Sequence, residues 1–215
     1  AVRRSNSRAI ADLFAAQAGK FVSVSAGDAL ETTLAAFGSG AAARSVRETA
    51  RVMNIDIGGG TTKIAVCENG ELVDLTAVDI GARIVALDAQ GCLVRLEEAG
   101  RKFAEEVGVT LQLGQPVAQE DLTCMVDRMA DRIFEVAGTS HPDSISQSLL
   151  RLEPLRALKM PDVLTFSGGV SEYVYGREAQ AYGDLGPLLA VAVRRKAQAW
   201  GPRLEVPDQG IRATV

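Results

Sequence analysis

The residues of this chain with the clearest chemistry are an aspartate, three consecutive glycines and two threonines. They follow an apolar run and read Asp56, Ile57, Gly58, Gly59, Gly60, Thr61 and Thr62. Glycine lacks a Cβ and reaches positive φ angles at little cost, so its backbone can approach a ligand closely. Successive N–H groups in such a turn form a concave anion site, and each hydrogen bond to a charged group contributes about 1.5–3 kcal/mol. The sequence therefore predicts a phosphate-binding loop.

Asp56 stands at the edge of this predicted loop and indicates a metal ion. Strand alternation places Met53, Ile55 and Ile57 on one side and Asn54 and Asp56 on the other. A carboxylate repels a phosphate unless a cation lies between them, and Mg²⁺ can do so because it keeps its waters and uses few carboxylates. We expect Asp56 to be the metal-binding and catalytic residue, and the ligand to be a nucleotide with Mg²⁺.

Two other glycine loops do not fit the spacing. A Walker loop places its lysine directly after the last glycine, whereas two threonines separate Gly60 from Lys63. A dinucleotide fingerprint needs a helix after the glycines, but residues 62–68 alternate as a strand and Asn69-Gly70 is a strong hairpin signal. The loop is therefore predicted to join two antiparallel strands, with a further strand over residues 71–80. The alternative is a tight hairpin that binds no ligand.

The glycine loop resembles the second phosphate loop of the actin, sugar-kinase and heat-shock-chaperone ATPase superfamily. That resemblance implies an adenosine loop downstream, and residues 162–172, which include Gly168, Gly169 and Ser171, are similar to it. A narrower resemblance, to ethanolamine ammonia-lyase reactivating factors, spans essentially the whole chain. The segments that carry it are residues 37–45, 54–80, 79–83, 167–175, 184–189 and 209–215.

The narrower resemblance implies an ATP-dependent reactivating chaperone. Such a protein releases damaged cobalamin from ethanolamine ammonia-lyase, its protein partner, so that intact adenosylcobalamin can bind. The implied cofactors are ATP and Mg²⁺, with the glycine loop at the β- and γ-phosphates and Gly168, Gly169 and Ser171 at the adenosine. Weak ATPase activity is expected of the full-length protein. The implied location is the cytoplasm, in association with a bacterial ethanolamine-utilisation microcompartment.

Two other functions would use the same phosphate cradle. A small-molecule kinase of this superfamily needs a carboxylate base for its acceptor, and the sequence offers no convincing one. An actin-like filament-forming ATPase needs self-complementary surfaces, which a sequence does not show. Both therefore stay open as alternatives at this point.

The resemblance also implies an α/β fold, namely an actin-like ATPase lobe with a ribonuclease-H-like mixed sheet flanked by helices and a smaller inserted α/β subdomain. No second Asp-x-Gly-x-x-x-Thr loop precedes residue 50, and the chain does not begin with methionine. We therefore expect a piece of a longer protein that lacks most of the first lobe and, alone, binds and hydrolyses ATP poorly. The expected units are residues 1–50 (tail of the first lobe and hinge helix), 51–86 (phosphate-loop hairpin), 87–155 (inserted subdomain) and 156–215 (adenosine loop and end of the second lobe).

Hydrophobic periodicity predicts helices at residues 7–19, 29–37, 97–107, 120–138 and 184–200, and short strands at 20–25 and 204–206. Similarity places the alanine-rich stretch 41–43 at the hinge. Chaperone relatives carry a glutamate before these alanines, where this chain has Ser39 and Gly40, which favours slow hydrolysis. A helix of the corresponding insertion in those relatives reaches the nucleotide with basic residues, so Arg128 and Arg132 are candidate contacts. The alternative is a solvated face shared with nearby acids.

Composition limits the remaining classes of function. The chain has 215 residues, of which 47% are hydrophobic, enough to bury one good core. The net charge is −4 and there is no basic block, so nucleic acid is not an expected partner. No apolar run approaches the roughly 20 residues that span a bilayer, so a membrane is not expected either. Cys67, Cys92 and Cys124 lack metal-site or redox spacing and are expected to be reduced thiols.

Overall fold

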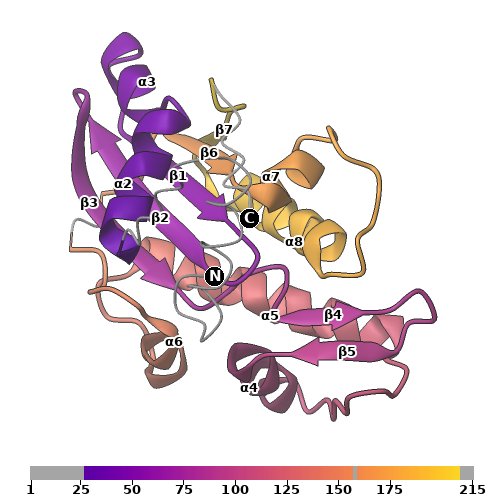
Figure 1. The fold of residues 1–215 in the computed structure, drawn as a ribbon. Helices are drawn as coiled ribbons and strands as arrows, with labels where there is room; N and C mark the ends of the chain where they lie inside the picture. The colour runs from indigo at the N-terminus through magenta and orange to yellow at the C-terminus, as the bar shows by residue number, and fades with distance from the viewer. Residues whose placement is uncertain (1–26, 157–158, 209–215) are drawn as a thin grey trace, which may run out of the picture.

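A computed structural model describes residues 27–156 and 159–208, and Figure 1 shows how they are arranged. A five-stranded sheet in the order β3-β2-β1-β6-β7 forms the centre, and a two-stranded sheet of β4 and β5 lies apart from it. The helix predicted at residues 7–19, the strand at 20–25 and the closing motif at 209–215 lie outside the described residues.

The central sheet is mixed. β1 (Val52–Ile57), β2 (Thr62–Glu68) and β3 (Glu71–Val78) form an antiparallel meander. β6 (Val163–Ser167) then pairs parallel to β1, and β7 (Arg203–Leu204) pairs parallel to β6. This order and these directions are those of a ribonuclease-H-like sheet, so the predicted α/β fold class is confirmed.

The conformation of the turn between β2 and β3 is explained by its two central residues, Asn69 and Gly70. Asn69 has a φ angle of 50° and Gly70 one of 84°, and positive φ at both central positions is the reason why Asn-Gly is favoured in two-residue hairpins. The predicted hairpin at this position is confirmed.

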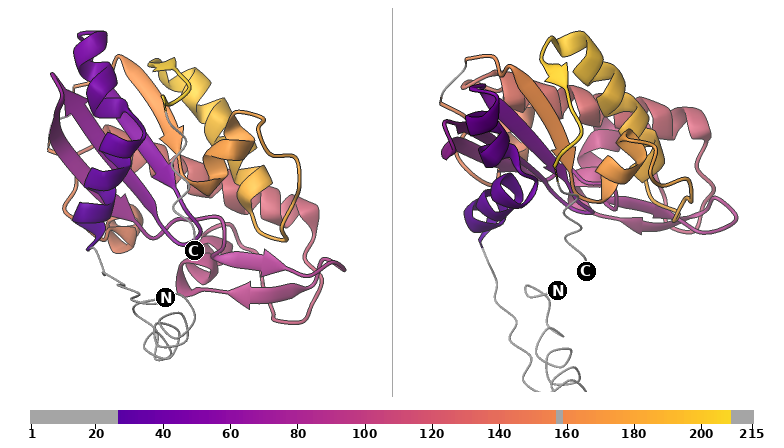
Figure 2. Two further views of the ribbon diagram at one scale, coloured as in Figure 1. Left: turned by 45° about the horizontal axis from the view of Figure 1, so that its top comes forward. Right: turned by 90° about the horizontal axis from the view of Figure 1, so that it is seen from above.

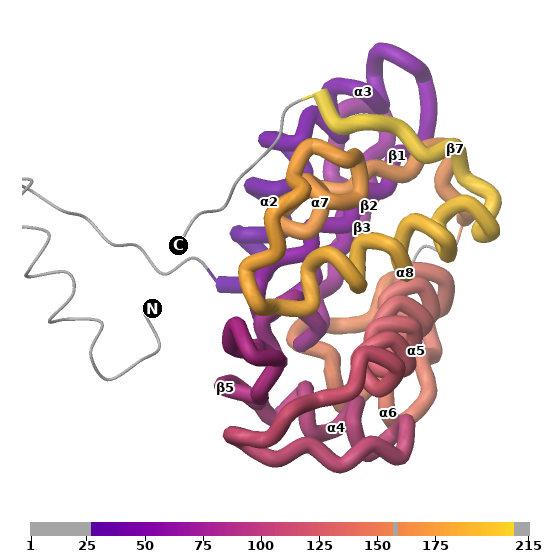
Figure 3. Tube along the Cα trace, turned by 90° about the vertical axis from the view of Figure 1, so that its right-hand side faces the viewer, coloured from indigo at the N-terminus to yellow at the C-terminus, as the bar shows by residue number. Residues whose placement is uncertain are grey.

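Helices cover both faces of the sheet, as Figure 2 shows. On one face the predicted apolar set of Met53, Ile55 and Ile57 enters the main core. That face is covered by α5 (Gln119–Gly138), α7 (Gly169–Val174) and α8 (Gly186–Trp200). Figure 3 shows α5 and α7 packed alongside α8. On the other face, α2 (Asp28–Gly38) and α3 (Ala41–Arg47) pack on the sheet, partly through small side chains such as Ala36, Ala41 and Ala42.

The segment after β3 leaves the central sheet and returns to it through α5. It contains β4 (Val85–Leu87), β5 (Leu93–Leu96) and α4 (Glu98–Glu106), which project together below α8 in Figure 1. α5 packs on α8, and the short α6 (Ser144–Leu149) follows it. None of the helices in the described part of the chain is long and apolar enough to cross a lipid bilayer.

Candidate functional site

The predicted phosphate loop is an exposed turn whose carbonyl groups are tied down. The N–H of Gly58 donates to the carbonyl of Thr61 at 3.0 Å, which closes the turn between β1 and β2. The N–H groups of Ala82 and Arg83 donate to the carbonyls of Gly58 and Gly59 at 3.0 and 2.6 Å. Within the described residues the N–H groups of Gly59 and Gly60 donate to no protein acceptor. The turn therefore offers solvent two backbone donors, as an anion site requires.

The glycines of this loop are not required by backbone strain. None of them has a positive φ angle, so the loop does not use the access of glycine to that region. A Cβ added at Gly60 would meet nothing within 4 Å, and one at Gly59 would meet only the flexible side chain of Arg83, at 3.3 Å. The fold itself thus has room for side chains at both exposed positions. A remaining reason for glycine at positions 59 and 60 is that a ligand can then approach the backbone closely.

The predicted adenosine loop lies directly against the end of β1. A Cβ on Gly168 would come within 2.5 Å of the carbonyl oxygen of Ile57, and Gly168 has a φ angle of 81°. Here, unlike in the phosphate loop, the fold itself excludes any side chain. Gly169 is exposed and begins α7, while the buried hydroxyl of Ser171 donates to the carbonyl of Gly168 at 2.7 Å. Ser171 therefore holds the turn, and its hydroxyl points into the protein.

Asp56 belongs to a buried chain of hydrogen bonds between β1 and β6. Its carboxylate accepts from the hydroxyl of Ser167 at 2.7 Å, and the Ser167 oxygen accepts from the amide of Asn54 at 2.9 Å. Thr165 then donates to the amide oxygen of Asn54 at 2.8 Å. Burial, which leaves Asp56 only 4% exposed, raises the pKa of its carboxyl group, although the Ser167 hydrogen bond and the charge of Lys63 oppose that shift. These hydrogen bonds fix the orientation of the Asp56 side chain at the base of the loop.

The site offers one carboxylate for a metal ion, so most ligands of such an ion would be water or phosphate oxygens. Within residues 27–156 and 159–208, no group of three His, Cys, Asp or Glu side chains is arranged to hold a metal. Asp56 is a single, mostly buried carboxylate beside the loop. Mg²⁺ keeps several waters and uses one or two carboxylates together with substrate phosphates. The donor set therefore fits Mg²⁺ bound through water and phosphate oxygens.

The two threonines of the loop differ in their roles. Thr62 is buried and its hydroxyl donates to the carbonyl of Ile80 at 2.7 Å, so its side chain braces the loop from behind. Thr61 is partly exposed, and its hydroxyl oxygen accepts from the ammonium of Lys63 at 3.1 Å. Lys63 also pairs with Glu31 of α2 at 3.1 Å. The sequence reasoning missed this pair, although Lys63 is the register partner of Asp56 and so shares its face of the sheet.

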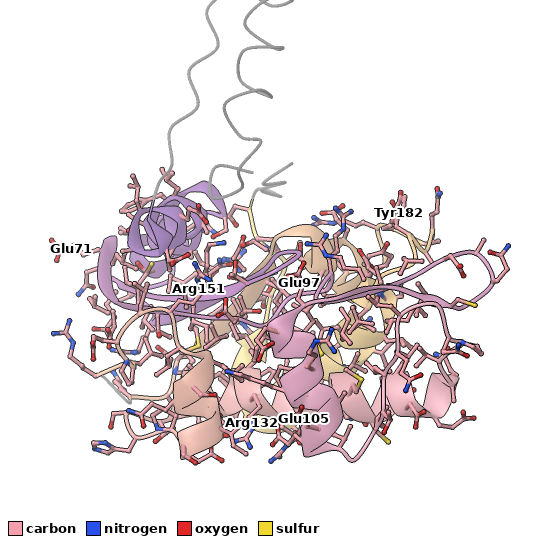
Figure 4. All side chains as sticks on the ribbon, turned by 60° about the horizontal axis from the view of Figure 1, so that its bottom comes forward. Glu71, Glu97, Glu105, Arg132, Arg151 and Tyr182 are labelled. Carbon is pink, nitrogen blue, oxygen red and sulfur yellow. The ribbon has the colours of Figure 1, made fainter. Side chains whose placement is uncertain are left out.

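A hollow of about 320 Å³ adjoins Gly60 and Thr61. Its charged lining consists of Asp79, Arg83, Arg95, Glu97, Glu98, Lys102 and Arg151. Two residues of this lining, Arg151 and Glu97, are labelled in Figure 4. Lys102 comes from α4, so α4 forms part of the wall of the hollow beside the loop. The wall is of mixed charge, and within it Arg95 pairs with Glu97 and Arg151 pairs with Asp79.

The predicted role of Arg128 and Arg132 finds no support in their surroundings, because neither residue lines this hollow. Arg132 is only 1% exposed and contacts the carboxylates of Glu106, Glu135 and Asp143. Arg128 donates to the same Glu106 at 2.6 Å. Arg132 is therefore a buried cation that is paired with one mostly buried carboxylate and two more exposed ones, rather than part of a solvated face. Figure 4 shows Arg132 well away from Arg151.

Comparison with known proteins gives a consistent family. A family model described as "Ethanolamine utilisation protein EutA" matches residues 1–215. The "Ethanolamine ammonia-lyase reactivase EutA" of Salmonella typhimurium (strain LT2) is 36% identical over 200 residues, which are 92% of this chain and 42% of that protein. The protein of the same name from Escherichia coli (strain K12) is 34% identical over the same shares. This chain thus spans less than half the length of either relative.

Solved structures give weaker likenesses. A Ppx/GppA family member from Aquifex aeolicus aligns with a TM-score of 0.43 and 14% identity, over 84% of this chain and 44% of that one. The Bacillus thuringiensis protein ParM with ATP aligns with a TM-score of 0.34 and 13% identity, over 74% and 41% of the two chains. The fold assignment accordingly rests on the strand order and directions given above.

Proposed function

This chain belongs to the ethanolamine utilisation protein EutA family, and from that membership we propose that it serves in the ATP-dependent reactivation of ethanolamine ammonia-lyase. In this proposal the full-length protein binds the lyase in the cytoplasm, at the ethanolamine-utilisation microcompartment. It releases damaged cobalamin so that intact adenosylcobalamin can bind. Both curated relatives are named as reactivases of that lyase, but this chain covers 42% of each, so the activity is proposed for the whole protein.

The main support for a nucleotide site in this proposal is the packing of the Gly168 turn on Ile57. This contact puts two glycine corners at one edge of the sheet, where the parallel strands β1 and β6 both end. A ligand with its phosphates on Gly59 and Gly60 would then have its nucleoside within reach of Gly168 and Gly169. Ligands of open α/β sheets commonly bind outside the carboxyl ends of the strands.

Each residue of the site has a distinct role in this proposal. The N–H groups of Gly59 and Gly60 donate to the β- and γ-phosphates, and Thr62 and Ser171 hold the two turns. Asp56 would hold Mg²⁺ through the waters of the ion. When bound, the metal ion supplies charge neutralisation, which with positioning accounts for most catalysis in phosphoryl transfer. Lys102 of α4 lines the hollow beside the loop and adds a positive charge near the ligand.

The nucleotide can act on the lyase only through unequal binding. A ligand shifts an equilibrium by its difference in affinity for two states, so the ATP and ADP forms must bind the lyase differently. We propose that α3 is the hinge helix toward the first lobe, and that β4, β5 and α4 form the inserted subdomain. Movement between these parts would then carry the change. The family membership and the relatives' names support neither the kinase nor the filament alternative.

A reactivation assay tests this function. Ethanolamine ammonia-lyase that carries a cobalamin without its adenosyl group is mixed with full-length protein, Mg²⁺ and free adenosylcobalamin, with or without ATP. We expect lyase activity to return only when both the protein and ATP are present. Equal recovery without ATP, or no recovery with it, would contradict the proposal.

A further inference from the structure

Two cations beside the phosphate loop are held by acids of a single helix turn. The Lys63 ammonium lies 3.1 Å from the Glu31 carboxylate, and the Arg151 Nε lies 3.0 Å from the Asp28 carboxylate. Asp28 and Glu31 are both in the first turn of α2 and three residues apart, so they share one side of the helix. These pairs fasten the start of α2 to the part of the protein that carries the loop.

The same two cations also border the proposed phosphate site. Lys63 donates to the hydroxyl oxygen of Thr61 at 3.1 Å, and its side chain is only 12% exposed. Arg151 lines the hollow of about 320 Å³ together with Gly60 and Thr61. Arg151 also donates to Asp79 at 2.7 Å, so it keeps one fixed partner independent of α2. Lys63 thus contacts both α2 and Thr61 of the loop, and Arg151 contacts α2 and lines the hollow beside the loop.

We propose that Lys63 and Arg151 are phosphoryl-binding cations that α2 shares with the ligand, an inference that rests on the proposed nucleotide function. Hydrogen bonds from ammonium and guanidinium groups to phosphate are short and strong. A polyphosphate on the loop therefore competes with Glu31 and Asp28 for the two cations. The carboxylates of α2 then face a ligand of their own sign, and the first turn of the helix is released.

The released helix turn gives the ligand a route to the rest of the protein. α2 runs into α3 through Ser39 and Gly40, and α3 packs on the sheet next to β1 and β2. The charge on the loop would thereby set how firmly the start of α2 is held. Because coupling between two equilibria is reciprocal, a change in α2 that loosens its hold on Lys63 and Arg151, and leaves both cations in place, must also strengthen ligand binding.

The substitutions that test this coupling should have opposite signs. In the full-length protein, Glu31→Gln removes the competitor and is expected to tighten Mg²⁺–ADP binding about threefold, the effect of one half-exposed ion pair. Lys63→Met removes the shared cation and is expected to weaken binding at least about tenfold. A pair that only stabilised the fold would shift both affinities in the same direction. Glu71→Gln, an exposed change at the far end of β3, is the matched control and is expected to match the wild type.

Calorimetry and hydrogen exchange decide the outcome. Mg²⁺–ADP is expected to speed amide exchange in Asp28–Gly38 of the wild type and to have little further effect in Glu31→Gln. If Glu31→Gln binds ADP no more tightly than the wild type, or if ADP leaves exchange in α2 unchanged, the shared-cation proposal is wrong while the nucleotide site stands. If the wild type binds no nucleotide, the proposed function fails and this inference fails with it.

Discussion

Gly168 lies against the carbonyl oxygen of Ile57 so closely that a Cβ on it would come within 2.5 Å of that oxygen. This contact joins the two glycine corners, which are separated by more than a hundred residues in the sequence. It also divides the glycines of the site into two kinds. Gly168 is required by the fold, whereas Gly59 and Gly60 are exposed and have no such requirement.

Gly168→Ala is expected to destabilise the protein. The added Cβ meets backbone atoms of Ile57, and the φ of 81° with ψ of 178° belongs to a region that is nearly restricted to glycine. We expect a loss of about 2–4 kcal/mol in the free energy of unfolding, measured by urea denaturation. The neighbouring Gly169→Ala is the control, because its Cβ would meet nothing within 4 Å. Equal stability of the two variants would contradict this role of Gly168.

Gly59→Val and Gly60→Ala should separate binding from folding. The Cβ at Gly60 has open space, and Arg83 can move away from one at Gly59, so both variants should unfold within about 1 kcal/mol of the wild type. In the full-length protein, the added side chain is expected to keep the phosphate away from the backbone N–H, and the hydrogen bond lost in this way weakens ATP binding about ten- to a hundredfold. We expect Gly59→Val, with the bulkier side chain, to abolish reactivation. Reactivation by a folded Gly59→Val protein would show that the loop does not hold phosphate.

Asp56→Asn is expected to stabilise the folded protein near neutral pH and to abolish reactivation. Burial raises the pKa of Asp56 above its ordinary value of 3.8, so the folded state holds this proton more tightly than the unfolded state does. The stability linked to Asp56 is therefore present below pH 3.8 and is lost as the pH rises through the higher folded-state pKa. The stability of Asp56→Asn relative to the wild type should thus grow between pH 4 and pH 7, measured by urea midpoints, while reactivation is lost. A relative stability that falls over this range would contradict the assigned burial.

The network around Arg132 predicts a purely structural effect. Removing a buried partner leaves uncompensated charge and typically costs 3–5 kcal/mol, so Arg132→Ala should lose about that much stability. Arg128→Ala, at the exposed end of the same network, should lose about 1 kcal/mol or less. The hydrogen bond from Arg132 lowers the pKa of Asp143, so the contribution of that pair disappears as the pH falls below the ordinary value of 3.8. A large drop in nucleotide affinity for Arg128→Ala would instead show that these arginines contribute to nucleotide binding.

The sequence predicted the features that depend on local pattern. Alternation around Ile55 and Ile64 and the Asn69-Gly70 turn are short-range signals, and the structure has the hairpin that they predict. The second glycine corner was located by resemblance, since nothing local to Gly168 indicates which residue it will contact.

The contacts that the sequence could not supply join distant segments. Glu31 meets Lys63 across a helix and a strand, and periodicity gives no register between such elements. Periodicity likewise put Arg128 and Arg132 on one side of a helix, but it could not show that Glu106 and Asp143 would bury the second of them. Lys63 is the register partner of Asp56 in the β1–β2 hairpin, and alternation alone does not fix that register.

The central claim is that the backbone of Gly59 and Gly60 binds the phosphates of a nucleotide. Its most direct test is to titrate full-length protein labelled with ¹⁵N-glycine with Mg²⁺–ATP and to follow the two amide resonances, assigned with Gly59→Ala and Gly60→Ala variants. Both N–H signals are expected to move downfield in proportion to bound nucleotide. Nucleotide saturation that leaves both signals in place would contradict the account.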